Sequence, residues 1–271
     1  MHEFLRALVP TTAKNALSFF LLHGRFFVEG IKDAAVAVRY TPPVPPPKLR
    51  HRVHGSIPLQ GFLDVGKQVA GDLTAMLADV GHAIPAQGQI LDWGCGCGRV
   101  LRFLAPALPG RAYFGCDIDR ELITWCQRHL DVGSFTHVDI TPPLPYADAQ
   151  FDFVYGISVL THLDEANQDR WLAEVHRVLK PTGIAILTVH GRFDHDRLPA
   201  EKREKLERTG FLFDITSTGK FKADGLPEYY QTAYHTAAYI ERHWSNLFRI
   251  VKHCEQGINH HQDAVILRKA V

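Results

Sequence analysis

The residue types best suited to chemistry are concentrated in one short stretch, Ile90–Leu104, with the sequence ILDWGCGCGRVLRFL. Its first half holds one carboxylate, three glycines and two thiols: Asp92, Gly94, Cys95, Gly96, Cys97 and Gly98. The thiols could form a metal or redox site. Alternatively, the glycines could form a backbone cradle around a ligand.

The spacing of Cys95 and Cys97 disfavours the metal and redox interpretations. A structural zinc site uses four ligands, usually as two separated pairs, and redox pairs have two intervening residues rather than one. The chain has five cysteines, an odd number with no framework spacing. We therefore expect no bound metal, and a reducing, cytoplasmic setting.

The glycines instead suit a loop that binds a ligand through its backbone. An apolar run precedes them and helical spacing follows them, which predicts a strand, a tight turn and a helix. Glycine tolerates the backbone angles of such a turn and lets a ligand approach closely. The helix behind the turn presents unpaired N–H groups at its N-terminus. Nicotinamide enzymes have a third glycine where this chain has Arg99, which argues against that cofactor.

Around this loop, short runs of β-forming residues alternate with amphipathic stretches. The alternation predicts right-handed βαβ crossovers and a parallel sheet covered on both faces. The expected strands are Ile90–Trp93, Ala112–Cys116, Phe135–Val138, Phe151–Ile157 and Ile184–Val189, and the expected helices are Phe62–Gly81, Arg99–Leu108, Glu121–His129 and Glu165–Leu179. Two further strand-like runs, Phe248–Cys254 and Ala264–Lys269, have no helix between them and predict an antiparallel hairpin.

A proline-rich connector, Thr41–Arg52, is predicted to be extended because it contains five prolines. We expect an N-terminal helical arm and connector over residues 1–60 and the main domain over 61–271. Within that domain, the core is expected over 88–190, an irregular insertion over 191–244 and the hairpin over 245–271. The apolar stretch Ala16–Val38 is interrupted by too many charges to cross a membrane. It is expected to pack on the domain, on a second copy in a homo-oligomer, or on a membrane surface.

The motifs and their order resemble the class I S-adenosylmethionine-dependent methyltransferases of the small-molecule type. D-x-G-x-G-x-G at the glycine loop is similar to the first motif of that family, and FGCDID (Phe114–Asp119) to the end of its second strand. Three further segments resemble the later motifs of the family in the same order. They are HVDITPPLPYADAQFDFVYG (His137–Gly156), ISVLTHL (Ile157–Leu163) and EVHRVLKPTGIAILTV (Glu174–Val189). The resemblance implies an α/β, Rossmann-like, seven-stranded and mostly parallel sheet, completed by the C-terminal antiparallel hairpin.

The resemblance also implies S-adenosyl-L-methionine as the cofactor. Asp117 would accept hydrogen bonds from both ribose hydroxyls, and Asp92 would lie near the methionine amino group. Asp139 would meet the adenine amino group, with Ile140 against the ring. The complete expected cofactor set is Asp92, Gly94, Cys95, Gly96, Gly98, Asp117, Ile118, Asp139, Ile140 and Ser158.

Residues that act on the methyl acceptor are expected among the histidines and tyrosines. A sulfonium is already activated, so transfer depends first on the in-line approach of a nucleophile, and histidine is the natural base near neutral pH. We expect catalytic roles for His162 and His235. Substrate contacts are expected from Tyr229, Tyr230, His190, His260 and His261. Arg50 or Arg52 of the arm is expected either to meet an anionic group as part of a lid or to be solvated.

The net charge of the chain indicates which kinds of partner are expected. With a net charge of +1, the chain shows no general attraction to nucleic acid, and we expect none as a partner. The expected acceptor is a small or glycan-like molecule that is methylated on oxygen or nitrogen. Two alternatives stay open: a catalytically silent scaffold or partner subunit with the same fold, and a nicotinamide-dependent oxidoreductase.

Overall fold

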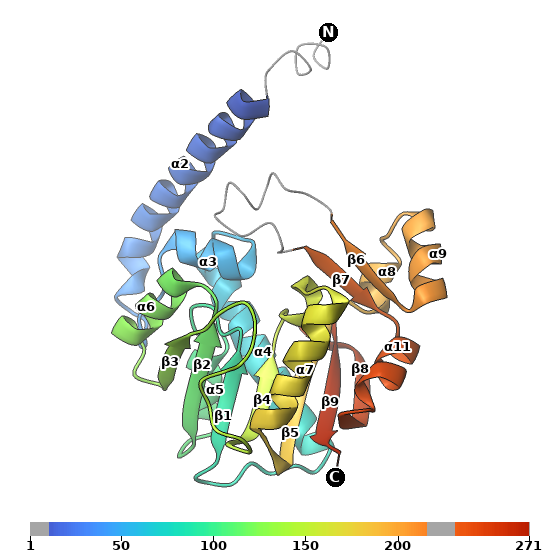
Figure 1. Cartoon of the computed structure of the whole chain (residues 1–271). Helices are drawn as coiled ribbons and strands as arrows, with labels where there is room; N and C mark the ends of the chain where they lie inside the picture. Colours follow the sequence, from blue (N-terminus) through green and yellow to red (C-terminus); the bar gives the residue numbers. More distant parts are fainter. Residues whose placement is uncertain (1–10, 216–230, 271) are drawn as a thin grey trace.

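The computed structural model describes residues 11–215 and 231–270. Seven strands of this part of the chain form one sheet, in the order β3-β2-β1-β4-β5-β9-β8 (Figure 1). These strands are β1 (Gln89–Trp93), β2 (Ala112–Asp117), β3 (Ser134–His137), β4 (Phe151–Gly156), β5 (Leu179–Val189), β8 (Phe248–Ile258) and β9 (Gln262–Lys269). The first five are parallel, and β9 is antiparallel to both β5 and β8. The predicted mostly parallel sheet with a C-terminal antiparallel hairpin is confirmed.

Helices cover both faces of this sheet (Figure 1). One face packs against α4 (Leu59–Asp79), α5 (Leu101–Ala107) and α6 (Arg120–His129), and the other packs against α7 (Glu165–Val178) and α11 (Ala237–Trp244). Successive strand residues point to opposite faces. Accordingly, Ile90 belongs to the first hydrophobic cluster and its neighbour Leu91 to the second, and neither is exposed.

The insertion after β5 is more regular than predicted. It contains α8 (Arg192–His195), α9 (Ala200–Thr209), β6 (Phe211–Asp214) and β7 (Thr232–His235) before α11. The two strands pair antiparallel as a separate small sheet. The sequence FLFD of β6 gave too short an alternation to be recognised, and its partner TAYH lies far along the chain. The predicted substrate residues Tyr229 and Tyr230 lie outside the described residues.

The N-terminal arm consists of α2 (Thr11–Ala37) and α3 (Pro47–His54). In Figure 1, α2 extends away from the body of the domain and α3 lies over the ends of β1 and β2. The prediction of an extended connector over Thr41–Arg52 is wrong from Pro47 onward, because proline at the first helical position favours a helix rather than blocking it. No described helix combines the length and the apolar composition needed to cross a membrane.

Arg50 holds the arm together from inside. Its side chain is fully buried and pairs with Asp33 of α2. Its guanidinium also donates to the carbonyl of Pro45 at 2.7 Å and to that of Ile57 at 2.9 Å and 3.1 Å. Both expectations for Arg50 are therefore wrong, because the side chain neither faces the cavity nor is solvated. It joins α2 to the chain segments on either side of α3.

Candidate functional site

A cavity of about 770 Å³ opens at the carboxyl ends of β1, β2 and β4. The chain after β1 crosses to β2, while β4 lies on the other side of β1. Ligands of open α/β sheets bind where the strand order reverses in this way. Residues of α2 and α3 line the cavity together with the loops that follow these strands.

The glycine loop forms one wall of the cavity at Gly94 and Gly96. Both have positive φ angles, of 76° and 56°, which side-chain-bearing residues rarely adopt. A Cβ on Gly94 would lie 2.4 Å from Cγ2 of Val159, and one on Gly96 would lie 2.7 Å from Cγ2 of Val53. The loop can therefore adopt this conformation, with Val159 and Val53 packed against it, only because both positions are glycine.

Asp117 ends β2 beside that loop. Its Oδ2 accepts the backbone N–H of Gly96 at 2.8 Å, and its Oδ1 accepts that of Asp119 at 2.8 Å. Burial raises the pKa of Asp117 to about 6, although these two hydrogen bonds oppose the shift. A carboxylate fixed in this way lines the cavity and retains lone pairs that can accept from two neighbouring hydroxyls.

Asp92, at the end of β1, also lines the cavity. Only 2% of its surface is exposed, and its Oδ2 has no hydrogen-bond partner among the described residues. Burial raises the pKa of Asp92 to about 7. The nearby Tyr155 hydroxyl opposes this shift, and the charge of Asp117 adds to it. A buried oxygen without a partner is costly. A cationic group bound in the cavity would supply that partner.

Most of the remaining cofactor candidates lie where they were expected. Cys95, Ile118, Ile140 and Ser158 line the cavity. Two do not: Asp139 is exposed outside it, and Gly98 lies behind the loop, where a Cβ would meet Leu130 at 2.4 Å. Gly98 thus allows close packing of α6 against the loop rather than contact with a ligand.

The aromatic wall of the cavity includes a residue that the sequence did not single out. Trp171 of α7 lines the cavity and donates from Nε1 to the carbonyl of Ile140 at 3.0 Å. Its ring packs against that of Trp93 with centroids 5.3 Å apart. Trp171 therefore positions the loop that carries Ile140 and gives the cavity an apolar surface.

The cysteines of the loop are small buried residues. All five cysteines of the chain are free thiols, and burial raises the pKa of Cys97 and Cys116 well above the ordinary thiol range. Thiols in this state are poor nucleophiles and poor metal ligands. No group of three or more metal-binding side chains occurs in the described part of the chain.

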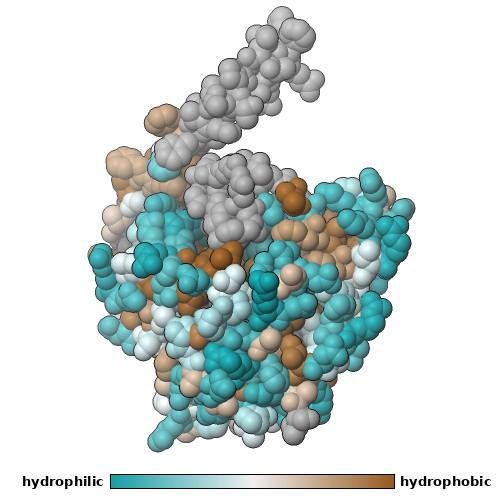
Figure 2. Space-filling view, viewed as in Figure 1, coloured by the Kyte–Doolittle hydropathy of each residue, from teal (hydrophilic) through white to brown (hydrophobic). Residues whose placement is uncertain are grey.

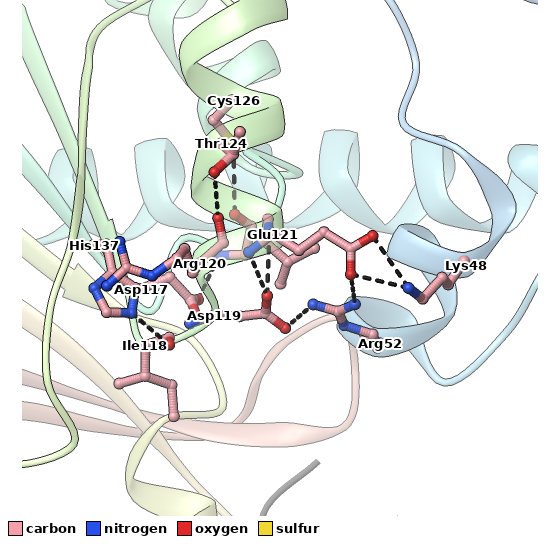
Figure 3. Close-up of polar contacts among 12 residues, drawn as sticks. Lys48, Arg52, Asp117, Ile118, Asp119, Arg120, Glu121, Thr124, Cys126 and His137 are labelled. Carbon is pink, nitrogen blue, oxygen red and sulfur yellow. Dashed lines mark hydrogen bonds and ion pairs between the residues drawn. The ribbon is translucent and has the colours of Figure 1, made fainter. Parts of the chain in front are cut away.

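The arm closes one side of the cavity through an ion-pair network (Figure 3). Arg52 of α3 pairs with Asp119 and, at 2.6 Å, with Glu121, and Lys48 pairs with Glu121 at 3.0 Å. Hydrogen bonding to Arg52 lowers the pKa of Glu121. Asp119 also caps α6 by accepting the N–H groups of Glu121 and Leu122. The network therefore ties the arm to the turn that presents Asp117.

His162 and His235, the two catalytic candidates, occupy different environments. His162 follows β4 in a short 3-10 helix, η1 (Leu160–His162), and lines the cavity. Its Nδ1 lies 2.8 Å from the carbonyl of Gln231, so Nδ1 carries the proton and Nε2 is the acceptor nitrogen. Burial lowers its pKa to about 4. His162 is therefore neutral at physiological pH.

His235 lies in the core instead, contrary to the prediction that it is catalytic. It is 1% exposed and its Nε2 lies 2.7 Å from Oε1 of Gln168. Burial lowers its pKa to about 3. The residue does not line the cavity. Its role is to join β7 to α7.

The three remaining histidine candidates for substrate contacts lie near one another but not in the cavity lining. Nδ1 of His190 lies 3.1 Å from the carbonyl of Ala233, and Nε2 of His261 lies 3.0 Å from Oδ1 of Asp194. His260 is exposed at the hairpin turn. The structure therefore leaves these three predicted substrate residues outside the cavity lining.

The arm residues that line the cavity were missed almost entirely. They are Leu22, His23, Phe26, Lys48, His51, Arg52 and Val53, of which only Arg52 was considered. A signal existed, because Leu22 and Phe26 are four residues apart and share one face of the expected helix. Sequence alone did not show against what that face packs.

Comparison with known proteins agrees with this geometry. Residues 90–183 match the model of a family described as "Methyltransferase domain". These residues form a methyltransferase domain. The chain is 32% identical over 113 residues to a fatty-acid O-methyltransferase of Mycolicibacterium smegmatis, covering 40% of each chain. It is 33% identical over 101 residues to a phthiotriol/phenolphthiotriol dimycocerosates methyltransferase of Mycobacterium ulcerans, covering 37% of this chain and 36% of that one.

The sequence matches cover only part of the chain. The chain spans about two-fifths of the length of these curated relatives. A solved structure with the same fold is the 1,6-didemethyltoxoflavin-N1-methyltransferase of Burkholderia thailandensis. It has a TM-score of 0.54 at 16% identity, with 84% of this chain and 92% of that one covered. S-adenosyl-L-methionine is the cofactor of this family, and the glycine loop, Asp92 and Asp117 fit it.

A substitution of Arg52 tests whether its ion pairs hold α3 against the cavity. We expect Arg52→Ala to weaken binding of S-adenosylhomocysteine about three- to tenfold, because partly exposed pairs contribute modestly. Hydrogen exchange of the α3 amides should rise at the same time. Arg128→Ala, an exposed change on the same helix as Glu121, is the control and should alter neither measurement. Unchanged exchange in α3 would show that other contacts hold the arm.

Proposed function

We propose that this protein transfers a methyl group from S-adenosyl-L-methionine to an oxygen or nitrogen of a small molecule in the cytoplasm. Relatives named for fatty-acid and phthiotriol substrates support an acceptor with a long apolar part. The apolar contribution of Leu22 and Phe26 to the cavity wall supports it as well. The near-neutral charge of the chain supports a non-nucleic-acid acceptor.

One observation carries this proposal: a buried carboxylate, Asp92, and a half-buried one, Asp117, flank a glycine cradle in a single cavity. Asp92 Oδ2 is the oxygen that lacks a partner, and it suits the cationic amino group of the methionine part. Asp117 is held by two backbone N–H groups in an orientation that suits a ribose diol. The two glycines let Val159 and Val53 pack directly against the loop.

The remaining residues then have assignable tasks. When bound, the cofactor supplies a methyl group activated on a sulfonium. The arm and Trp171 exclude water from the cavity, which strengthens the polar contacts inside it. Neutral His162 offers an acceptor nitrogen and can take the proton of a hydroxyl or amine as the nucleophile attacks. Its low pKa makes it a weak base, so its main contribution is to orient the acceptor.

Two alternatives predict other results. A nicotinamide oxidoreductase would need a third glycine where Arg99 stands, and its ligand would be NADH. A silent scaffold would bind S-adenosylhomocysteine but methylate no acceptor.

The test is a calorimetric titration with S-adenosylhomocysteine and, separately, with NADH. We expect binding of the first compound only. Binding should release a proton, because the ligand ammonium lowers the raised pKa of Asp92, which is about 7 in the free protein. Affinity should therefore rise as the pH increases through about 6 to 7.5. Titrations in buffers of different ionisation enthalpy measure the number of protons released on binding. Preference for NADH, or no binding, would refute the proposal.

A further inference from the structure

The outer face of α2 is the largest feature that the proposed function leaves unexplained. We propose that this face binds the surface of an anionic lipid membrane and places the cavity mouth against the bilayer, so that the methyl acceptor is a membrane lipid. The choice of acceptor rests on the proposed function. The membrane contact itself rests on the exposed side chains of α2.

These side chains form one continuous apolar face. The large exposed apolar residues of the segment are Phe20, Leu21, Phe27, Val28, Ile31 and Val38, with exposures of 71%, 61%, 71%, 50%, 61% and 86%. Gly24, Ala34 and Ala35 complete the same face and are also exposed. At 100° per residue, the eight of these positions that lie in α2 fall within less than half of the helix circumference, and Val38 follows just after its last residue. Figure 2 shows the apolar surface gathering where α2 leaves the body.

The opposite face of α2 is already occupied. Asp33 is bound by Arg50, while Leu22 and Phe26 line the cavity. The exposed apolar face therefore cannot be the one that packs on the domain. Interfacial helices typically combine such a face with basic residues at its edge, lie flat in the headgroup region and insert their aromatic side chains.

The charges at the edge of this face suit an anionic surface. Arg25 and Lys32 lie along one edge, next to Leu21 and Val28 on the helix, and Arg39 follows just beyond its end. The only acidic residues between Phe20 and Arg39 are Glu29, which pairs with Lys32 at 2.7 Å, and Asp33, which pairs with Arg50. Arg25 and Arg39 have no carboxylate partner among the described residues. Anionic lipids would neutralise both.

A second copy of the chain complements the cationic edge of α2 less well than an anionic membrane does. It would bring only the same face and the same cationic edge, with no carboxylate left to complement Arg25. Like charges placed together in an interface are unfavourable. The same helix also joins the apolar face to the cavity: Phe27 is exposed, while its neighbour Phe26 lines the cavity. A lipid could therefore pass from the bilayer to the cavity along one side of α2.

The test is flotation of the full chain with lipid vesicles. Vesicles of phosphatidylcholine with about 30% phosphatidylglycerol should bind the protein, and binding should weaken with salt. We expect Phe27→Glu combined with Ile31→Glu to weaken binding at least about tenfold, because two charges would enter the apolar layer. The matched control is Ile215→Glu, which makes the same change at a residue that is 70% exposed elsewhere.

The outcomes separate this inference from the proposed function. S-adenosylhomocysteine binding is measured on the same proteins and should be equal in all of them, because Phe27, Ile31 and Ile215 do not line the cavity. Vesicle binding by the wild type and the control, but not by the double variant, supports the inference whatever the cofactor result. No vesicle binding, or equal loss in the control, overturns it. A dimer that sedimentation shows to dissociate in the double variant, without vesicle binding, would assign the face to a second copy.

Discussion

Asp117→Ala is expected to lower the affinity for S-adenosylhomocysteine by at least about 100-fold, because two hydrogen bonds to a charged group are lost and each contributes about 1.5–3 kcal/mol. The side chain meets the ligand at a fixed angle, since the N–H groups of Gly96 and Asp119 hold both of its oxygens. Removing it therefore leaves the ribose hydroxyls without an acceptor. Calorimetric titration of the variant measures the loss.

Two controls keep this result interpretable. Asp117→Asn retains one acceptor oxygen without the charge and should fall between the wild type and the alanine variant. Asp131→Ala removes an exposed carboxylate after α6 and should bind normally. Thermal unfolding of each variant shows whether the glycine loop survives the loss of its two contacts. An Asp117→Ala protein that is folded and binds as the wild type does would exclude this residue from the cofactor site.

Arg50→Met is expected to lower the free energy of unfolding by about 3–5 kcal/mol, because breaking a buried ion pair leaves the other charge uncompensated. Asp33 is only 8% exposed, so water cannot replace the guanidinium. The carbonyls of Pro45 and Ile57 lose their donors as well. Urea denaturation, monitored by a signal from the arm and by one from the domain, measures the effect and shows whether the arm unfolds first.

The matched control for this pair lies on the same helix. Lys32 pairs with Glu29 at 2.7 Å, but its side chain is 63% exposed, so Lys32→Met should change the free energy of unfolding by less than about 0.5 kcal/mol. The double variant Arg50→Met/Asp33→Leu should be more stable than Arg50→Met alone, since it removes the stranded carboxylate. Equal stability of Arg50→Met and the wild type would show that the arm does not depend on the pair.

The parts of this molecule that could be predicted from sequence are those set by local patterns. The strand of Ile90 and Leu91, the turn at Gly94 and Gly96, and the cap at Asp119 each follow from residues close together in the chain. The position of Asp117 also followed, because a carboxylate at the end of the second strand must reach the same sheet edge as the loop. Family resemblance then supplied the ligand.

The missed parts depend on contacts between distant residues. Nothing near Arg50 indicates that it will be buried by Asp33 and two carbonyls, and its basic neighbours suggested a solvent-facing lid. His235 lies in an aromatic stretch that resembles an acceptor pocket, yet β7 pairs with β6 and turns it toward Gln168. The presence of a histidine in the sequence does not reveal whether its side chain will face a ligand or pack in the core.

Contact between Val53 and the glycine loop has a consequence for the timing of each catalytic cycle. Gly96 accommodates Val53 so closely that even a methyl group there would collide with it, and Lys48 and Arg52 hold the same helix over the cofactor end of the cavity. On the proposed function, we infer that α3 must move before the spent nucleoside leaves. The rate of product release would then depend on the contacts of the arm as well as on the transfer of the methyl group.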